Sequence, residues 1–566
     1  MNFDTNSYLD LGSDTNFKID TEASGSTFDV LRFKSDVKLN FDKVKNFEIN
    51  MKKNKGDMFV FGTSNNEMNI NQQDVEFRKT NDSELHGFYG INSAYIPINY
   101  YAKTQNDIDV NTKDNSNLTK NSFLNNFDVS DFKHLKVSEE TSQKNNPLHK
   151  ISKFDDLKNA MLDQYVTRIS VEDDLVNDND SSSHRDVRIP LRSIDFNGNN
   201  HKIDFRGTSF YNNDRVLKNS NIIWNISDAD MYGRNYYGPF KTDGVTGGKD
   251  SGTGTFNYSN IDYKGAQLTA SYKYTLHMKG TIKNNSVNSY ISPFDEKKYS
   301  CDTNQVNIEA NNLIFDDNCH YDGTTENAGV IWLGVFGTSG NLTVGDNAVV
   351  NLTSNGTGGE GYAVLRCMGK MVTGRDSQVN INTRASGGQR AVQLIKGEDT
   401  ENLMHLDKNS SVNIDDAKYT TKKSSVPLID IASNTNILVD DHAHLNVDTM
   451  QTTKDNGKWA QGSVISAASN SRLEIGDKGY FRVKSGGDAN LNLLDFSSNN
   501  EFILNNAKTV DIDARKNTND NTNLISMSSG VLDSSEQAVS AWNRKNDTDD
   551  RDFSWNPIKD MKVFYT

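Results

Sequence analysis

Short segments in which apolar and polar residues alternate run through most of the chain. Three of them follow one another as "PLIDIAS", "NILVDD" and "AHLNVDT" between positions 427 and 449. Three more follow as "SVISAAS", "RLEIGD" and "YFRVKS" between 463 and 485. Strict alternation over four to six residues is typical of a β-strand with one buried face. The pattern therefore predicts sets of three short strands, repeated along the sequence.

One turn position, just after the second strand of each set, gives the period of the repeat. It falls at intervals of 29, 33, 33, 36 and 29 residues, on Gly345, Gly374, Asp407, Asp440, Gly476 and Asn505. Glycine, aspartate and asparagine tolerate a left-handed backbone or close an Asx turn. Three strands in about 30 residues indicate a solenoid, here an all-β parallel β-helix whose coils stack about 4.8 Å apart. A two-sheet sandwich fits less well, because its turns lack this three-strand super-period.

The alternation also assigns the core-facing positions. Within each coil, the residue two before the last aliphatic residue of the third strand should point inward. This predicts a ladder of equivalent buried residues: Val350, Val379, Val412 and Leu445.

A longer repeat divides the chain into two modules. Gly12 resembles Gly476 and Asp42 resembles Asn505, while "DFKHLKV" at 131–137 resembles "PIKDMKV" at 557–563 at a smaller offset. The difference in offset predicts extra residues in the first copy, near "EMNINQQDVEFRK". Residues 1–140 are accordingly expected to be the C-terminal part of one β-helix module, and 141–566 a complete second one, so that the chain is part of a longer array. The polar stretch "EETSQKNNPL" at 139–148 is expected to be an exposed linker.

The front of the second module differs from the regular coils. "SKFDDLKNAML" at 152–162 has apolar residues at helical spacing after a serine cap, which predicts a short capping helix over the first coil. The segment 209–280 is rich in tyrosine and glycine and is expected to be an insertion or a set of distorted coils.

These segments resemble a known family. "KISKFDDLKNAMLDQYVTRISVEDDL", followed by "IPLRSIDFNGNNHKIDFRG", "MYGRNYYGPF" and "IDYKGAQL", is similar to the pectate-lyase-like adhesive domain of Gram-positive surface proteins, found in large repetitive proteins of lactic-acid bacteria. The similarity covers about 148–566. It implies a right-handed parallel β-helix with an adhesive or surface-structural role, because sharing a fold with pectate lyases does not establish activity.

Composition and charge exclude several classes of function. The 566 residues carry a net charge of −15, and no basic stripe with interleaved aromatic residues appears, so no nucleic-acid partner is expected. The longest apolar run is too short to cross a bilayer, and the N-terminus has no signal-peptide pattern. The expected location is therefore extracellular, at the cell surface, with no signal peptide or anchor in this chain. Of three cysteines, Cys301 and Cys319 could pair in a secreted protein, but three separate buried thiols are favoured.

An enzyme on this fold would need concentrated charge, which the sequence does not show. Asp430 and Asp495 occupy equivalent positions, but Ser466 separates them by a coil, which is at the limit for a hydrolase pair. Arg366 and Arg390 lie near strands and could imitate a lyase base, yet no acid cluster accompanies them. The cluster "FDDNCHYD" at 315–322 and the pair His442 and His444 are weak metal candidates, and we predict no metal site. No phosphate loop, nucleotide fingerprint or nucleophile–base motif appears, so no cofactor is expected.

The sequence therefore predicts a non-catalytic adhesive or structural module that binds glycans or surface proteins of a host or the environment through its flat polar faces. The candidate binding residues are six tyrosines: Tyr232, Tyr236, Tyr237, Tyr263, Tyr272 and Tyr274. The competing explanation for these rings is that they cover the core beneath a long loop. Two other functions stay open: a polysaccharide lyase or hydrolase, and a fragment of a phage tail spike.

Overall fold

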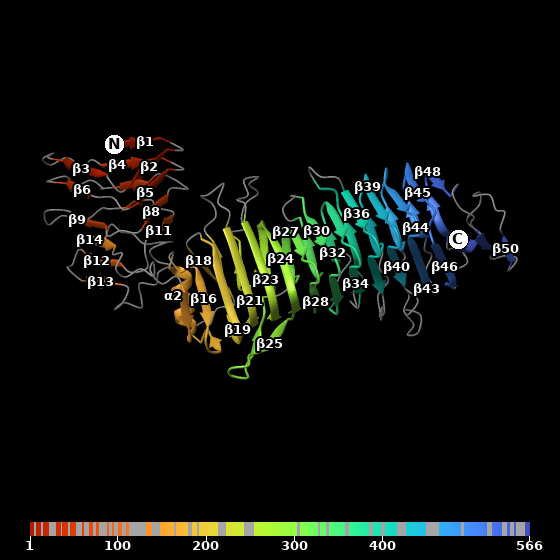
Figure 1. Cartoon of the computed structure of the whole chain (residues 1–566), viewed down its shortest axis with the longest axis horizontal. Coiled ribbons are helices and arrows are strands. Elements are labelled where there is room, and N and C mark those ends of the chain that lie inside the picture. The colour runs from red at the N-terminus through yellow and green to blue at the C-terminus, as the bar shows by residue number, and fades with distance from the viewer. Residues whose placement is uncertain are drawn as a thin grey trace. The chain divides into compact units, whose positions relative to one another are not determined.

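The computed structural model is built almost entirely of β-strands and divides into two compact units (Figure 1). The first comprises residues 1–175, 186–197 and 210–223, and the second comprises 176–185, 198–209 and 224–566. The structure describes the whole chain except the segments 5–6, 13–14, 22–29, 35–36, 43–45, 52–58, 62–66, 72–74, 79–87, 90–92, 96–99, 105–108, 112–131, 138–147, 164–165, 179–183, 190–191, 213–221, 243–253, 303–305, 327–328, 335–338, 357–360, 384–388, 398–401, 416–425, 449–462, 488–491, 518–522, 535–539, 544–547, 551–560 and 566.

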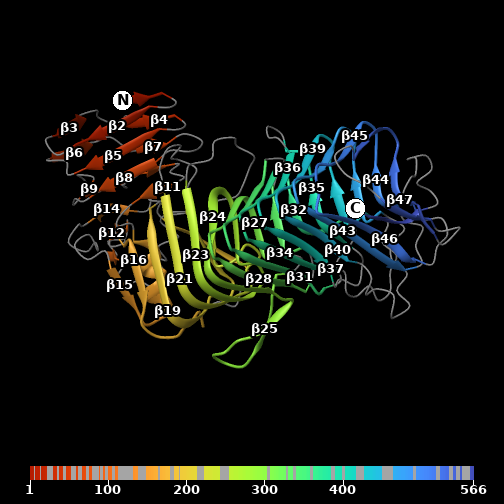
Figure 2. The ribbon, with the colours of Figure 1, turned by 45° about the vertical axis from the view of Figure 1, so that its right-hand side comes forward.

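The second unit is a right-handed parallel β-helix, as predicted, with three strands in each regular coil. Its outer surface has three faces, each a row of parallel strands from successive coils, visible side by side in Figures 1 and 2. The first face contains β27 (Ile308–Phe315), β29 (Ile331–Leu333), β32 (Ala363–Cys367), β35 (Arg390–Leu394), β38 (Ile429–Ile431), β41 (Ile465–Ala467), β44 (Asn492–Phe496) and β47 (Asn523–Met527).

The other two faces have the same construction. The second face continues along β27 and contains β30 (Asn341–Val344), β33 (Lys370–Thr373), β36 (Asn402–Leu406), β39 (Thr435–Val439), β42 (Arg472–Ile475), β45 (Asn500–Leu504) and β48 (Gly530–Asp533). The third face contains β24 (Thr269–Ser286), β28 (His320–Thr325), β31 (Val349–Ser354), β34 (Gln378–Thr383), β37 (Ser411–Asp415), β40 (His444–Asp448), β43 (Tyr480–Gly487) and β46 (Thr509–Asn517).

Alternation along each strand builds the core, because every second side chain points into the coil. Val350 pairs with Val379, Val379 with Val412, and Val412 with Leu445. The four side chains are 0%, 0%, 0% and 1% exposed. The predicted inward ladder is therefore confirmed. Burial of such apolar ladders is the main contribution that stabilises the stacked coils.

A column of left-handed residues makes the turn between the second and third faces. Six residues share positive φ angles between 53° and 61°: Asn318, Asn347, Asp376, Asn409, His442 and Lys478. Their amides reach the next coil; the amide of Asn347, for example, donates to the carbonyl of Arg375 at 2.9 Å. Four of the six are asparagine or aspartate on a backbone that few other L-residues adopt readily. The turn residues used as the ruler of the repeat lie next to this column.

The segment 209–280 forms coils with unusually long strands. Its strands are β20 (Thr208–Asn212), β21 (Ile222–Gly233), β22 (Phe240–Lys241), β23 (Gly254–Gly265) and the first part of β24. β23 pairs with β24 in parallel over most of its length, with a register shift between Ser259 and Ile261. Of the two expectations for this segment, distorted coils describe it better than an inserted loop. A hairpin follows, in which β25 (Ser289–Ile291) and β26 (Lys298–Ser300) pair antiparallel, and Figure 2 shows it outside the coils.

The first unit contains the predicted helix, α2 (Phe154–Leu162), after β15 (Leu148–Ile151) and before β16 (Arg168–Val171). Its apolar face is buried, with Leu157 and Met161 both at 0% exposure. The C-terminal end is held by the buried Arg192, whose guanidinium donates to the carbonyls of Ala160 and Met161 at 2.9 and 3.0 Å. A cation at this end also complements the helix dipole. Burial lowers the pKa of Arg192 to about 10.

The remaining strands of the first unit form coils of the same design. They are β1 (Asn2–Phe3), β2 (Tyr8–Leu11), β3 (Asn16–Thr21), β4 (Leu31–Phe33), β5 (Lys38–Asp42), β6 (Asn46–Met51), β7 (Phe59–Phe61), β8 (Glu67–Asn71), β9 (Val75–Arg78), β10 (Phe88–Tyr89), β11 (Ser93–Tyr95), β12 (Tyr100–Thr104), β13 (Asp109–Asn111) and β14 (Phe132–Val137). Strands β17 (Leu175–Val176), β18 (Arg185–Ile189), β19 (Ile194–Asp204), β20 and β21 contain residues of both units. The expected linker at 139–148 lies outside the described residues except for Leu148.

Both sets of coils end in the same antiparallel arrangement. β14 pairs with β9 and β12, and β12 pairs with β13. In the second unit, β51 (Met561–Tyr565) pairs with β46 and β49 (Ser540–Asn543), and β49 pairs with β50 (Thr548–Asp550). Because an antiparallel strand covers the free edge of the last coil, this arrangement closes each solenoid to further parallel pairing.

The shared ending corrects the register of the longer repeat. It equates β8 with β45, and "SNNEMNI" at 64–70 is indeed similar to "SNNEFIL" at 498–504. Gly12 then corresponds to Asp440, and Asp42 to Gly476, so the earlier alignment was wrong by one coil. The offset then falls from 434 at "SNNEMNI" to 426 at the last strand, so the first copy still carries eight extra residues between these two points.

Candidate functional site

The candidate site lies on the first face of the second unit. There, one outward position carries polar or aromatic side chains on successive coils. Glu309 of β27 pairs with Trp332 of β29, which pairs with Arg366 of β32. The same position continues through Gln393 of β35 to Asp430 of β38. Parallel pairing places each side chain one coil spacing, about 4.8 Å, from the next.

Trp332 and Arg366 form the centre of this surface. The guanidinium carbon of Arg366 lies 4.6 Å from the centre of the Trp332 ring, a cation–π contact. Tyr362 approaches the same ring edge-on at 6.2 Å. Among the residues that the structure describes, the guanidinium has no carboxylate partner: Nη2 contacts the sulfur of Met368 at 3.8 Å, and Nε has no hydrogen-bond partner. Partial burial lowers the pKa of Arg366.

The neighbouring arginine is neutralised. Nε of Arg390 donates to Oδ2 of Asp430 at 2.6 Å, and the amide of Gln393 approaches the same oxygen at 3.4 Å. The Arg390 side chain is 16% exposed and that of Asp430 is 31% exposed, so the pair is partly shielded from water. Arg390 is therefore paired with a carboxylate, whereas Arg366 has no such partner in the described part of the chain.

At the β27 end of the row, the carboxyl group of Glu309 is hydrogen-bonded to the phenol of Tyr272. The hydroxyl of Tyr272 donates to Oε2 of Glu309 at 2.5 Å. Glu309 is 6% exposed, and burial raises its pKa. Burial and the adjacent Glu309 likewise raise the pKa of the Tyr272 phenol. Burial therefore disfavours the charged form of this carboxyl group.

Two other predicted tyrosines lie near Tyr272. The rings of Tyr236 and Tyr237 meet edge to face at 4.6 Å, and Nζ of Lys241 lies 4.3 Å from the centre of the Tyr237 ring. His184 contacts the same ring at 5.9 Å. Both tyrosines are half-buried, and both interact electrostatically with Tyr272. We call this surface the aromatic–basic patch: Tyr236, Tyr237, Tyr272, Glu309, Trp332, Tyr362, Arg366.

The other three predicted tyrosines do not belong to this patch. Tyr263 and Tyr274 are 0% and 2% exposed, so for these two the competing explanation, that the rings cover the core, is the correct one. The pairing of β24 with β27 shifts register between Ser271 and Thr275, and this irregularity separates the half-buried Tyr272 from the buried Tyr274. Tyr232 is half-buried and packs against Tyr290, at the hairpin rather than the patch.

A second polar cluster holds the hairpin of β25 and β26 onto the coils. The buried carboxylate of Asp204 accepts hydrogen bonds from the hydroxyls of Tyr290 at 2.6 Å and Ser292 at 2.7 Å. Arg206 lies 3.2 Å from the same carboxylate and 3.7 Å from the centre of the Tyr299 ring. The polar groups of this cluster bond to one another, so it serves to anchor the hairpin.

The carboxylates considered for catalysis are spread out, as expected. Asp430, Ser466 and Asp495 lie in register on consecutive coils, and Asp430 is occupied by Arg390. In "FDDNCHYD", Asp316 pairs with His277 at 2.6 Å and His320 with Asp322 at 3.2 Å, which separates the acids.

The remaining candidate groups are also accounted for. His442 lies in a turn beside Asp441, whereas His444 on β40 stacks on Tyr480 with ring centres 4.0 Å apart. Among the described residues, no group of three possible ligands could hold a metal ion. The three cysteines are free and buried. No described helix has the length and apolar character needed to span a bilayer.

Sequence reasoning missed the centre of the patch. Trp332 lies in "GVIWLGVFG", the longest apolar run of the chain, which sequence reasoning used only to exclude a membrane span. Its neighbours Ile331 and Leu333 are buried at 0%, so alternation along β29 leaves the tryptophan outside. That alternation was readable in the sequence. The stacking of Arg366 on Trp332 was not, because 34 residues separate the two and only the coil register joins them.

One family model and two solved structures are similar to the chain or to part of it. Residues 149–270 match the family model described as "Putative pectate lyase-like adhesive domain", which confirms the resemblance for this part of the chain. The solved structure of the SRRP of L. reuteri 53608 is similar at 16% identity and a TM-score of 0.36, over 63% of this chain and 99% of that one. The SRRP of L. reuteri 100-23 is similar at 18% identity and a TM-score of 0.34, over 63% and 95%. No curated protein matches the chain.

Proposed function

We propose that this chain is a non-catalytic, extracellular adhesive module that binds glycans carrying carboxylate or sulfate groups at the aromatic–basic patch. The observation that carries the proposal is the guanidinium of Arg366, which stacks on Trp332 and contacts no carboxylate of the described residues. A planar guanidinium in this state offers paired N–H donors to an anionic group. The exposed part of the indole offers an apolar surface to the C–H groups of a sugar ring.

The electrostatics of the patch support an anionic ligand. Glu309 is the carboxyl group nearest to Trp332 in the row, and it is only 6% exposed and accepts a hydrogen bond from the hydroxyl of Tyr272. Asp430 is neutralised by Arg390. The net charge of −15 for the whole chain means that local positive charge, rather than the overall field, would have to attract the ligand.

The spacing of the acids argues against hydrolysis. Glu309 and Asp430 lie four coil steps apart in the row, roughly 19 Å at the usual strand spacing. A glycosidase needs two carboxylates within roughly 5–10 Å. The match to an adhesive family description points the same way. Location at the surface of a Gram-positive bacterium is part of this proposal.

A matched pair of polymers tests the proposal. Polygalacturonate should bind the protein, and its fully methyl-esterified form, which has the same rings without the charge, should bind at least tenfold more weakly. Binding should also weaken as salt is raised from low to physiological strength and above, because screening shortens the reach of the arginine charge.

Variants locate the site. Trp332→Ala and Arg366→Gln should each lower the affinity at least tenfold. Arg472→Gln, on the second face and already paired with Glu474, should leave it unchanged. Equal binding of both polymers, or unchanged binding by both patch variants, would contradict the proposal. Appearance of unsaturated sugar products during the assay would instead favour the lyase alternative.

A further inference from the structure

The third face of the second unit carries a continuous row of asparagine side chains. Nδ2 of Asn351 donates to Oδ1 of Asp322 at 2.7 Å, and Nδ2 of Asn380 donates to Oδ1 of Asn351 at 2.8 Å. Asn413 donates to Asn380, and Asn446 to Asn413, each at 2.9 Å. Four hydrogen bonds therefore run in one direction across β28, β31, β34, β37 and β40. We call this feature the asparagine row: Asn351, Asn380, Asn413, Asn446.

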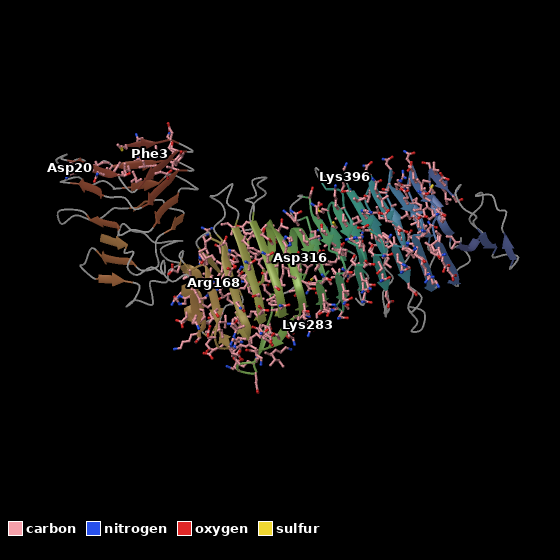
Figure 3. All side chains as sticks on the ribbon, viewed as in Figure 1. Phe3, Asp20, Arg168, Lys283, Asp316 and Lys396 are labelled. Atoms are coloured by element: carbon pink, nitrogen blue, oxygen red, sulfur yellow. The ribbon has the colours of Figure 1, made fainter. Side chains whose placement is uncertain are left out.

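The row lies between opposite charges. Asp322 accepts the first hydrogen bond, and Arg482 follows Asn446 in register on β43. Lys283, labelled in Figure 3, precedes Asp322 in register on β24. A negative group at the accepting end and a positive group at the other favour the observed direction of the amide dipoles. Over the four coils between them the row carries no charge.

The amides keep unused bonding capacity at a regular spacing. A primary amide has two N–H donors and two acceptor lone pairs. Asn351, Asn380 and Asn446 each use one N–H, whereas Asn413 uses its second on the hydroxyl of Ser411 at 3.2 Å. All four side chains are half-buried, which fixes them and leaves one side open to water. The row therefore presents oriented donors and acceptors about every 4.8 Å.

The flanking positions disfavour an anionic ligand. On one side of the row lie Asn382 of β34, Asp415 of β37 and Asp448 of β40, which are paired in register. On the other side lie Val349, Gln378, Ser411 and His444, which are also paired in register. Two carboxylates flank the asparagines on β37 and β40, where no arginine or lysine does, and the basic residues Arg482 and Lys484 follow only on β43. The surface beside the middle of the row is therefore acidic, unlike the aromatic–basic patch.

We propose that the asparagine row binds an uncharged, extended polysaccharide that lies along the solenoid axis and meets one amide with each sugar unit. Sugar hydroxyls donate and accept hydrogen bonds as amides do, and an uncharged polymer escapes the repulsion of Asp415 and Asp448. The coil spacing is comparable to the length that one sugar ring adds to an extended chain. An extended polypeptide fits less well, since it repeats each side only every two residues, about 6.6 Å.

A panel of neutral polymers tests this surface directly. The whole chain is run by affinity electrophoresis through gels containing hydroxyethyl cellulose, laminarin, mannan or dextran. At least one polymer should retard it, and the double variant Asn380→Ala with Asn413→Ala should weaken that binding at least tenfold. Asn341→Ala is the matched control, because Asn341 makes the same amide bond to Asn312, at 3.0 Å, on the second face. It should leave binding unchanged.

Further measurements separate the possible outcomes. Polygalacturonate binding should persist in the double variant, because the aromatic–basic patch lies on the first face. If the double alanine variant loses thermal stability, the double variant Asn380→Ser with Asn413→Ser repeats the test. Failure of every polymer to bind, or equal binding by parent and double variant, would overturn the proposal. So would a dimer of the parent that dissociates in the double variant, because the row would then contact a second copy.

Discussion

The hydroxyl of Tyr290 donates a 2.6 Å hydrogen bond to Oδ1 of Asp204, although 86 positions separate the two residues. Both side chains are buried, at 1% and 0% exposure. The bond joins the hairpin to the last residue of β19, and five strands lie between β19 and β25 in the sequence. Ser292 donates to the other oxygen of the same carboxylate, so the strand and the turn of the hairpin are held at one point.

Tyr290→Phe should therefore destabilise the protein with little change in packing. A hydrogen bond to a charged group contributes roughly 1.5–3 kcal/mol, and its loss leaves a buried carboxylate short of one donor. Thermal unfolding of the variant should begin at a lower temperature than that of the parent. Tyr299→Phe is the control, because its partner Asp295 is 28% exposed and water can replace the lost hydroxyl. A Tyr290→Phe variant as stable as Tyr299→Phe would contradict the assigned role.

The same bond should make stability sensitive to alkali. Burial and the nearby Asp204 raise the pKa of the Tyr290 phenol well above its ordinary value of about 10. A raised pKa in the folded state stabilises the protein below pH 10, and this contribution is lost as the pH rises above it. The unfolding temperature of the parent should fall more steeply above pH 10 than that of Tyr290→Phe. Parallel curves for the two proteins would show that Tyr290 does not govern the effect.

An inward and an outward substitution on one strand should differ sharply. Ile381 on β34 is 1% exposed and lies in a ladder with Leu352 and Ile414. Ile381→Ala should lower the free energy of unfolding by about 2–5 kcal/mol, since the coils on both sides prevent collapse of the cavity. Asn382→Ala, the next residue, should change it by less than about 0.5 kcal/mol. Denaturant unfolding measures both, and similar effects would contradict the assigned faces.

One turn position should be improvable. Lys478 has φ of 53°, in a column where most residues are asparagine or aspartate. Lys478→Asn should stabilise the protein by about 0.5–1 kcal/mol, because asparagine adopts the left-handed conformation at lower cost. The lost ion pair with Asp477 is exposed and contributes little. The exposed Lys508 provides the control, and Lys508→Asn should have no effect. A lower unfolding temperature for Lys478→Asn would refute this account.

His444 should make the third face less stable in acid. Burial, Arg482 and His442, in that order, lower its pKa from the ordinary value of about 6.5. A lowered pKa in the folded state gives stability above pH 6.5 that is lost as the pH falls below it. His444→Gln should therefore lose less stability than the parent between pH 7 and pH 5, and Arg482→Gln should be intermediate. An unchanged pH dependence in His444→Gln would exclude this histidine as the source.

Local pattern was sufficient to predict the coils. Alternation gave the inward ladder from Val350 to Leu445, and the repeated turn residues gave the period. Both signals depend only on near neighbours, since a strand in a solenoid sees the same environment on every coil. The helix α2 was predicted from the spacing of its apolar residues, and it ends at Leu162 as expected. The expected serine cap was wrong, because the N-cap residue is Lys153, which makes no side-chain cap hydrogen bond, and the helix begins at Phe154. Its buried partner Arg192 was not predicted, because the contact joins residues about 30 positions apart.

The proposed binding surface was less predictable. Clustering of tyrosines in the sequence indicated Tyr236, Tyr237 and Tyr272 together with Tyr263 and Tyr274, which are buried. A register shift in β24 separates the half-buried ring of Tyr272 from the buried ring of Tyr274. No local sequence pattern indicates this shift. The repeat alignment failed by one coil for a related reason, because successive coils resemble one another almost as well as equivalent coils do.

The sequence by itself therefore determined the class of fold, the inward and outward sides of the regular strands, and the positions of the turns, because these follow from side-chain chemistry at short range. Only the tertiary structure decided which outward groups meet. Stacking of coils brings Arg366 over Trp332 and aligns Asn351 with Asn380, residues 34 and 29 positions apart. These contacts depend on the length of each intervening loop, which sets the register of one coil on the next. The length of a coil varies from 29 to 36 residues because its loops differ in length. The alternation within the strands is the same in every coil, so it contains no information on these loop lengths.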